Sequence, residues 1–353
     1  MKVKDIAEIN LENIGKNYEG QLRYLDTSSV TDNYFENYKT YLSFKDAPSR
    51  ARRKANIGDT VISTVRPNQR HIGFINKQPN NAVYSTGFAV VSPNTRKVDP
   101  YYLYLFLSSD KITEMLQQIG ETSTSTYPSV KPSDIENLEI ELPSKDVQEK
   151  ISNELYLLDS KIKLNSQIND NLFELAKTLF SEEFSSNDEV LLSNYLLPKR
   201  GKNLLKKNVV SGEFPVVAGG LKPAAFHNAY NTKAPVITIS ASGANAGYVQ
   251  IWEQPVWSSD SSYIDTSITK DIYFWYLLLK KYQKQIFDAQ MGSAQPHIYP
   301  KHIGNLLIPN ISEDSIKDFN ITIAPIFKKI FQNKSENNKL KAIKNSLLIK
   351  YFN

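Results

Sequence analysis

The chain of 353 residues contains no cysteine. Without thiols it can form neither a disulfide nor a thiolate zinc site, and this composition is typical of proteins in a reducing interior, so we expect a cytoplasmic protein. No segment approaches the roughly 18 consecutive apolar residues that a membrane-spanning helix needs, and residues 1–10 lack the apolar core of a signal peptide. The sequence therefore predicts neither membrane insertion nor secretion.

Familiar catalytic motifs are also missing. The sequence has no phosphate-binding G-x-x-x-x-G-K-[ST], no H-E-x-x-H and no G-x-G-x-x-G that follows a strand. It has no Pro-Pro dipeptide, which the base-flipping signature of adenine methyltransferases contains, and only four histidines that could ligate a metal. We predict a protein without catalytic activity, metal or cofactor of its own. An enzyme with unrecognised motifs is the alternative.

The charge is mildly basic, with a net charge of +5 and a pI near 8.9. Such a balance permits a polyanionic partner without requiring one. Two clusters concentrate the charge: Arg50, Arg52, Arg53 and Lys54, and then Lys199, Arg200, Lys202, Lys206 and Lys207. Each cluster is a candidate for contact with nucleic acid, although a single cluster of this kind is more often a solvated face.

The sequence contains an internal repeat. Residues 127–138 align with 295–306 without a gap, matching two prolines, three aliphatic residues and an asparagine. Upstream, residues 61–75 and 237–249 each predict a strand, a polar loop and a second strand. Between these landmarks, residues 101–107 and 272–279 are rich in aromatic and aliphatic residues. We predict buried helices there, although such short apolar runs could equally form strands.

A long segment of helical period follows each half of the repeat. The first carries an apolar stripe at steps of three and four, formed by Val147, Ile151, Leu155, Leu158, Ile162, Asn165, Ile168, Leu172, Leu175 and Leu179. At one constant offset from it, the second segment carries Phe319, Ile323, Phe327, Ile330, Asn337, Leu340 and Leu347. We predict two antiparallel helices of about 30 residues, each roughly 45 Å long. Asn165 and Asn337 either fix the helix register as buried polar residues or are exposed at a stutter.

These patterns predict a mixed α/β (α+β) fold with a pseudo-two-fold internal repeat. Two similar globular domains, residues 1–145 and 185–313, are each followed by a spacer helix, residues 146–184 and 314–353. The two helices form a coiled coil that separates the domains.

Candidate DNA contacts lie in the predicted loops. Arg, Asn and Gln are suited to bidentate contacts with base edges, whereas hydroxyls and lysines mainly hold phosphates. The first loop supplies Thr64, Arg66, Asn68, Gln69 and Arg70, and its counterpart supplies Ser242 and Asn245. The polar segments at the two proline landmarks supply Ser125, Tyr127, Lys131, Ser293, Gln295, His297 and Lys301. For each of these residues, ordinary turn chemistry is the alternative. Asp260, among four serines, is interpreted as part of a turn.

These residues resemble a known family. The first half is similar to a target recognition domain, with the helix that follows it, in specificity subunits of Type I restriction-modification systems. The similarity lies in residues 49–53, Gly58 to Asn68, Tyr127-Pro128-Ser129-Val130, and Leu142-Pro143 entering Gln148 to Ile151. The second half, with Gly219-Gly220 and residues 237–240, resembles another such domain. The resemblance covers almost the whole chain.

The resemblance implies a non-catalytic DNA-binding subunit. Each target recognition domain would recognise one half of a split, asymmetric double-stranded DNA sequence, and the helices would set the gap and dock partners. Two modification subunits would supply S-adenosylmethionine and adenine methylation, and restriction subunits would supply ATP- and magnesium-dependent translocation and cutting. The alternative is a stand-alone adaptor or scaffold in phage defence.

Overall fold

A computed structural model describes residues 1–122, 127–184, 188–292 and 296–352. The chain divides into two compact units. Unit 1 comprises Met1–Ile162 with Asn338–Asn353, and unit 2 comprises Lys163–Asn337. Each unit therefore contains one domain of the repeat and part of both long helices.

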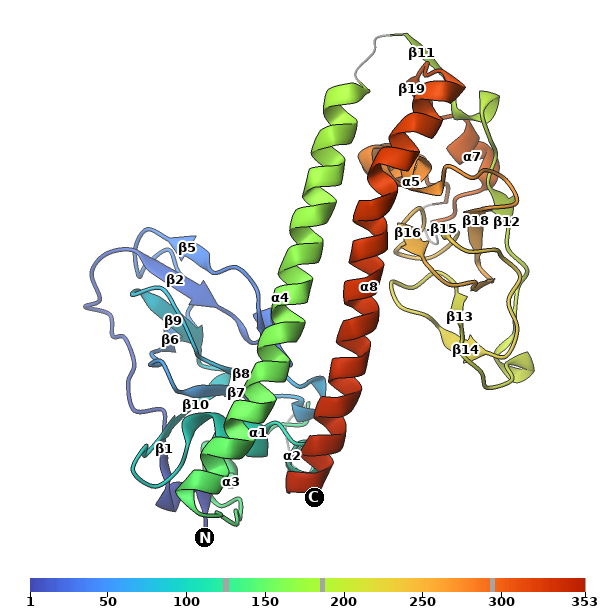
Figure 1. The fold of residues 1–353 in the computed structure, drawn as a ribbon. Helices are drawn as coiled ribbons and strands as arrows, with labels where there is room; N and C mark the ends of the chain where they lie inside the picture. The colour runs from blue at the N-terminus through green and yellow to red at the C-terminus, as the bar shows by residue number, and fades with distance from the viewer. Residues whose placement is uncertain (123–126, 185–187, 293–295, 353) are drawn as a thin grey trace. The chain divides into compact units, whose positions relative to one another are not determined.

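Unit 1 contains two four-stranded sheets (Figure 1). The first has the order β1 (Ala7–Ile9), β10 (Phe88–Pro93), β7 (Thr60–Ser63) and β8 (Ile72–Phe74), with antiparallel neighbours. The second has the order β5 (Lys39–Tyr41), β2 (Leu22–Leu25), β9 (Ala82–Ser85) and β6 (Ala51–Arg53), in which β2 and β9 are parallel. A two-stranded hairpin joins β3 (Val30–Thr31) to β4 (Tyr34–Phe35).

Three short helices complete the globular part of unit 1, namely α1 (Pro100–Leu107), α2 (Asp110–Glu121) and α3 (Pro132–Glu136). Every residue of α1 from Tyr101 to Leu107 is buried, which confirms the predicted buried helix. Pro100 occupies the first turn, and the Asp99 carboxylate accepts a hydrogen bond from the Tyr102 amide at 2.8 Å. This cap satisfies a backbone donor that the helix leaves unpaired.

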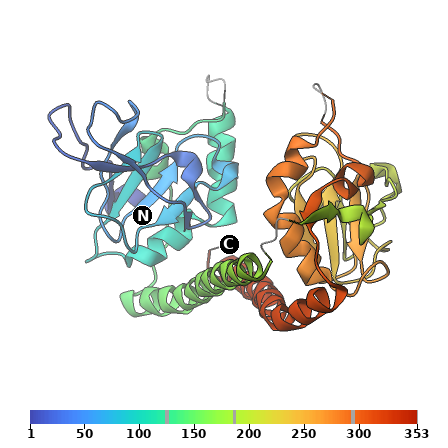
Figure 2. The same ribbon diagram turned by 90° about the horizontal axis from the view of Figure 1, so that it is seen from above.

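Unit 2 repeats the plan of unit 1. Its four-stranded sheet has the order β12 (Lys199–Arg200), β18 (Ser261–Asp265), β15 (Val236–Ser240) and β16 (Val249–Trp252). Its second sheet has the order β14 (Ala225–His227), β13 (Phe214–Val217) and β17 (Trp257–Ser258), and β11 (Glu189–Leu191) pairs with β19 (Leu307–Pro309). The helices are α5 (Ile272–Lys281), α6 (Gln283–Asp288) and α7 (Pro300–Gly304). Figure 2 shows α5 and α6, in orange, on one side of the yellow strands.

The predicted duplication is confirmed in the main elements of the two units. The order β1-β10-β7-β8 corresponds to β12-β18-β15-β16, and the parallel pair of β2 and β9 corresponds to that of β13 and β17. The predicted buried helix at 272–279 is α5. Among the described residues, β6 of unit 1 has no counterpart in the second sheet of unit 2.

The long helices are α4 (Lys145–Glu183, 39 residues) and α8 (Glu313–Phe352, 40 residues). Both are longer than the predicted 30 residues and span about 60 Å at 1.5 Å per residue. Only the estimate of about 30 residues, taken from the apolar stripe, was too short, because the helical backbone continues beyond the stripe at both ends; the bounds of the expected spacer helices, 146–184 and 314–353, lie within one residue of the observed ones. No helix among the described residues is long and apolar enough to span a membrane.

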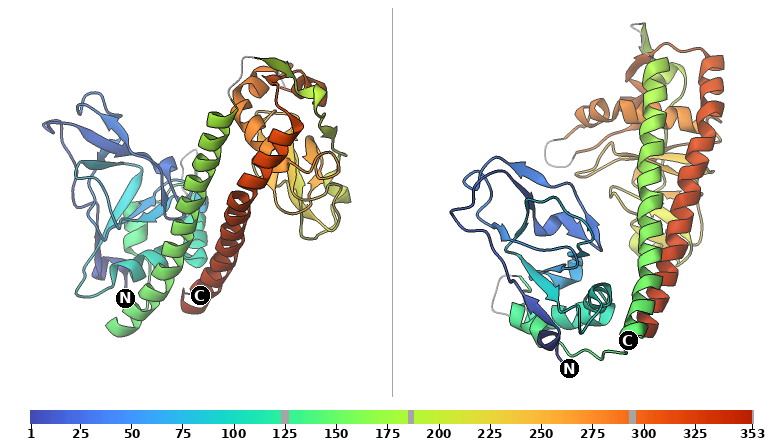
Figure 3. Two further views of the ribbon diagram at one scale, coloured as in Figure 1. Left: turned by 45° about the horizontal axis from the view of Figure 1, so that its top comes forward. Right: turned by 60° about the vertical axis from the view of Figure 1, so that its left-hand side comes forward.

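The helices α4 and α8 run side by side (Figure 3), and in unit 2 asparagine pairs set their register. The Asn165 amide donates to Asn337 Oδ1 at 2.9 Å, and the Asn333 amide donates to Asn169 Oδ1 at 2.9 Å. Partners whose numbers rise in one helix and fall in the other show that the helices are antiparallel. Asn165 is 1% exposed and Asn337 is 8% exposed, which confirms buried asparagines rather than an exposed stutter.

The predicted stripe is mostly correct. Ile151, Leu155, Ile323, Phe327 and Ile330 are buried, and Leu158, Ile162, Ile168, Leu172, Leu340 and Leu347 are partly buried. Two stripe positions of α4 are wrong, since Val147 is 44% exposed and Leu175 is 48% exposed. Ala176 is buried instead of Leu175. Leu172, Ala176 and Phe180 are spaced four residues apart, so they form one row along the helix surface, and this row faces the core of unit 2.

Candidate nucleic-acid interface

The loop between β7 and β8, residues 64–71, is here called the arginine loop. Its centre is a short 3-10 turn over Pro67–Gln69, in which Pro67 is buried. Arg66 and Arg70 flank this turn in the left-handed backbone region, at φ of 51° and 54°. Left-handed residues other than glycine are uncommon, and such strain persists where the surrounding contacts determine the conformation.

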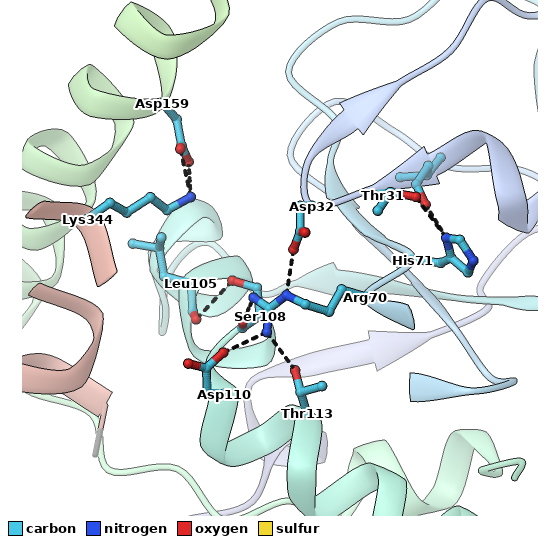
Figure 4. A network of polar contacts seen from close by, with 11 residues as sticks. Thr31, Asp32, Arg70, His71, Leu105, Ser108, Asp110, Thr113, Asp159 and Lys344 are labelled. Carbon is cyan, nitrogen blue, oxygen red and sulfur yellow. Dashed lines mark hydrogen bonds and ion pairs between the residues drawn. The ribbon is translucent and has the colours of Figure 1, made fainter. Parts of the chain in front are cut away.

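Arg70 supplies several of those contacts (Figure 4). Its Nε lies 2.6 Å from Asp32 Oδ1, its Nη1 lies 2.8 Å from Asp110 Oδ1, and its Nη2 donates to the Ser108 carbonyl at 2.8 Å. Burial opposes the charge of the guanidinium, but the hydrogen bond and the charge of Asp32, together with Asp110, outweigh it and raise the pKa of Arg70. Arg70 therefore ties the arginine loop to the β3–β4 turn, the end of α1 and the start of α2.

Arg66 is used differently. Its guanidinium carbon lies 4.1 Å from the centroid of the Tyr127 ring, a cation–π geometry, and Tyr127 is 53% exposed. Its backbone amide donates to the Pro128 carbonyl at 2.8 Å. Within the described part of the chain, no hydrogen-bond or ion-pair partner faces the guanidinium of Arg66. The structure thus brings together two predicted segments, residues 66–70 and the segment that contains Tyr127.

The other candidates in unit 1 lie at or beside this loop. The Thr64 hydroxyl donates to the Gly87 carbonyl at 2.9 Å, so that it serves the backbone. Asn68 and Gln69 are exposed, and the backbone N–H of Asn68 donates to Gln117 Oε1 at 3.2 Å. Lys131 is exposed at the start of α3. Whether each contacts DNA stays a prediction.

The basic cluster at 50–53 lies on or next to β6. Arg50 is exposed, and its backbone carbonyl accepts a hydrogen bond from the Thr86 amide. The next residue, Gly87, accepts a hydrogen bond from the Thr64 amide, so this end of the cluster is close to the arginine loop. Arg52 stacks on the Phe44 ring at 4.0 Å, and Arg53 Nη1 donates to Asn13 at 3.0 Å. Burial lowers the pKa of Arg53. Arg52 and Arg53 therefore also have structural contacts.

In unit 2, Asp260 gathers candidates from separate segments. Arg200 Nη2 lies 2.7 Å from Asp260 Oδ1, and the Ser242 hydroxyl donates to Asp260 Oδ2. Ser242 also forms a backbone bridge with His297. Asp260 lies in a bend between β17 and β18, in the place where the sequence predicted a turn. Its contacts with Arg200 and Ser242 were missed because the sequence gives no sign of them.

The remaining candidates of unit 2 surround this cluster. Lys199, Lys202 and Lys301 are exposed, and the Asn245 side-chain amide donates to the Gly219 carbonyl at 3.4 Å. Three other candidates, Ser125, Ser293 and Gln295, lie outside the described residues. No group of three or more potential His, Asp or Glu metal ligands occurs among the described residues.

One backbone scaffold underlies both interfaces. In unit 1, the Thr64 amide donates to the Gly87 carbonyl at 2.9 Å, and the Val130 amide donates to the Thr64 carbonyl at 2.8 Å. In unit 2, the Ala241 amide donates to the Asp260 carbonyl at 3.1 Å, and the Ile298 amide donates to the Ala241 carbonyl at 2.9 Å. Two equivalent frameworks therefore present different side chains at corresponding places.

Comparisons with known proteins agree with this duplication. The family model of the Type I restriction modification DNA specificity domain matches twice, at residues 1–174 and 185–345. The Type I restriction enzyme HindI specificity subunit of Haemophilus influenzae is 34% identical over 167 residues, which cover 47% of this chain and 36% of that subunit. The MjaIX specificity subunit of Methanocaldococcus jannaschii is 25% identical over 334 residues, which cover 82% of this chain and 76% of that subunit.

A solved structure shares the fold. The Type-I restriction-modification system S subunit from M. genitalium superposes with a TM-score of 0.64 at 17% sequence identity, over 99% of this chain and 94% of that one. At this identity the likeness concerns the fold alone.

Proposed function

Since this chain belongs to the Type I restriction modification DNA specificity family, as a non-catalytic DNA-recognition subunit, we propose that its two units each recognise one half of a split, asymmetric DNA site. The observation that carries the proposal is the duplicated scaffold. The same backbone hydrogen bonds position Arg66 and Tyr127 in unit 1, and Ser242 and Asp260 in unit 2. Different side chains on one scaffold suit two different half-sites.

The chemistry of the system would reside on partners. In the proposed complex, two modification subunits bring S-adenosylmethionine and methylate adenine, and restriction subunits bring ATP- and magnesium-dependent translocation and cutting. We place the complex in the cytoplasm, where these partners meet DNA. The exposed basic residues Arg50, Lys199 and Lys202 would hold phosphates and so make binding dependent on salt.

The long helices would set the gap between the half-sites. Their antiparallel pairing through Asn165 and Asn337 fixes one register, so the helix length determines a distance. Removing about seven residues from each helix, which preserves a heptad register, shortens the pair by about 10 Å, close to the rise of three base pairs.

The test is to express this chain with its modification partner and map methylated adenines across a genome. We expect two short sequences separated by a fixed unspecified gap, and matched helix deletions should shorten the gap while leaving both half-sequences unchanged. A contiguous motif, or no motif despite a stable complex, would contradict the proposal and favour an adaptor. An unchanged gap in the deletion variant would contradict the role of the helices.

A further inference from the structure

Two arginines four positions apart in one loop have opposite surroundings. Arg70 is held by two carboxylates and a carbonyl, at distances of 2.6 to 2.8 Å. Arg66 lies on an aromatic ring and has no hydrogen-bond or ion-pair partner for its guanidinium in the described parts of the chain. Since Arg70 has already used each of its guanidinium nitrogens, the two residues are not equivalent candidates for DNA contact.

Arg66 has the properties of a base-recognising residue. A guanidinium presents its donors in a rigid planar fork, and this fork matches the O6 and N7 acceptors of guanine in the major groove. Contact with the Tyr127 ring at 4.1 Å restricts the guanidinium without consuming a donor, and thereby lowers the entropy lost on binding. We propose that Arg66 recognises a guanine in the half-site of unit 1, and that Arg70 is the positioning residue that holds the arginine loop for this contact. The inference rests on the proposed function.

The positioning role of Arg70 follows from what it joins. Asp32 lies in the β3–β4 turn, Ser108 follows the last residue of α1, and Asp110 begins α2. Neighbouring His71 strengthens the same attachment, since its Nδ1 lies 2.8 Å from the Val30 carbonyl and 3.0 Å from the Thr31 hydroxyl. The loop is thereby attached on two sides, and Arg66 is presented from a fixed backbone.

Unit 2 has no equivalent of this pair of arginines. Its corresponding loop, residues 241–248, contains small residues with Asn245 and Tyr248, and no arginine. The effect of Arg66 should therefore be confined to one position in one half of the site.

The test uses the full chain in complex with its modification partner, with methylated adenines mapped for the wild type, Arg66→Ala and Arg66→Gln. We expect the wild-type motif to require guanine at one position where Arg66→Ala accepts other bases, with a loss of discrimination of about 5- to 150-fold there only. Arg66→Gln should shift the preference at that position toward adenine, because glutamine pairs with the adenine edge. Arg96→Ala, which removes an exposed arginine in the turn after β10, at the opposite end of the sheet, is the matched control and should keep the wild-type motif.

Arg70 variants separate positioning from base contact. Arg70→Ala should lower the methylation rate at every correct site without relaxing any base, and Arg70→Lys should restore part of the rate, because a lysine can still pair with Asp32 or Asp110. Relaxed selectivity at a single base in Arg70→Ala would instead make Arg70 the recognising residue and overturn the assignment.

The outcomes distinguish a failure of the proposed function from a failure of the role assigned to Arg66. A wild-type complex that yields no split motif contradicts the proposed function itself. A split motif that persists with every base unchanged in both Arg66→Ala and Arg66→Gln overturns the inference alone. Should Arg66→Ala fail to assemble, as judged by co-purification with the modification subunit, Arg66→Gln still decides the question.

Discussion

The two units hold the long helices by different chemistry at equivalent positions. Asn337 lies 172 positions after Asn165. The same offset of 172 positions pairs each residue that contacts a long helix in one unit with its equivalent in the other unit. In unit 1, Lys344 Nζ lies 2.7 Å from both carboxylate oxygens of Asp159 (Figure 4). The Tyr101 hydroxyl also donates to Asp159, at 2.5 Å. We call these three residues the Asp159 cluster. Burial, followed by the negative charge of Asp159, raises the pKa of Tyr101, so its hydroxyl remains a donor.

In unit 2, apolar residues occupy the places of the ionic pair, whereas the tyrosine is kept. The equivalents of Asp159, Lys344 and Tyr101 are Phe331, Leu172 and Tyr273. Phe331 is buried, Leu172 packs against the core, and Tyr273 stacks on Phe327 with ring centroids 4.8 Å apart. One backbone geometry thus accommodates either an ionic cluster or aromatic packing.

Some contacts are common to both units. Tyr102 packs on Phe352 with ring centroids 5.1 Å apart, and their equivalents Phe274 and Phe180 lie 5.4 Å apart. Duplication has therefore conserved where side chains meet more closely than which side chains they are. The units should consequently differ in how they respond to mutation and to pH.

The largest expected difference concerns matched core positions of the two helices. Phe327→Ala should lower the free energy of unfolding by about 3–5 kcal/mol, because it removes a buried ring that stacks on Tyr273. Leu155→Ala, at the equivalent position in unit 1, should cost about 2–5 kcal/mol. Urea unfolding of both variants measures the comparison, and a smaller loss in Phe327→Ala than in Leu155→Ala would contradict aromatic packing as the stronger attachment.

Next in size is the effect of breaking the Asp159 cluster. Lys344→Ala leaves a carboxylate whose side chain is only 17% exposed without its cation, and should cost about 3 kcal/mol. Replacing all three residues as Tyr101→Phe, Asp159→Leu and Lys344→Leu substitutes apolar side chains for the whole cluster, and should be neutral or stabilising relative to wild type. Equal losses in the single and triple variants, measured by urea unfolding, would show that the cluster is not interchangeable with apolar packing.

The smallest effect concerns Asp59, the residue immediately before β7. Its equivalent in unit 2 is the apolar Val236, at the start of β15. Burial raises the pKa of Asp59 above its ordinary value of 3.8, even though the Asn56 amide donates to its carboxylate. At pH 7 the folded state therefore carries the whole cost of the buried charge, and this cost disappears as pH falls through the raised pKa toward 3.8.

Asp59→Asn should accordingly gain stability relative to wild type at pH 7, and the gain should shrink as the pH is lowered. Unfolding free energies of both proteins across this range give the difference directly. Asp46→Asn, which removes an exposed carboxylate, controls for the loss of one negative charge. A gain that grows on acidification would reverse the sign and refute a raised pKa.

Regular, local patterns made much of the fold predictable. The aromatic run at 101–107, the spacing of the helix stripe and the repeated Pro128 and Pro296 landmarks each depend on neighbouring residues, so they are legible in one sequence. The buried Asn165 and Asn337 could be anticipated because both fall on the apolar stripe. The arginine loop could be anticipated as a polar insertion between two strands.

Contacts between distant segments could not be predicted in this way. The parallel pairing of β2 with β9 joins residues about 60 positions apart, and neither strand carries a mark of its partner. The choice between Leu175 and Ala176 on α4 depended on which surface of unit 2 the helix meets. The absence of a β6 counterpart from the second sheet of unit 2, among the described residues, likewise follows from assembly and not from local composition.

The sequence by itself determined the duplication, the two helices and the chemical types available for recognition. Only the tertiary structure decided how each residue is used. Arg66 and Arg70 are the same amino acid in one loop, yet Asp32 and Asp110 reach Arg70 from elements some 40 positions away, whereas Tyr127 reaches Arg66. The role of a charged side chain depends on the partners that folding brings to it, because an ion pair forms through space and leaves no local pattern in the sequence.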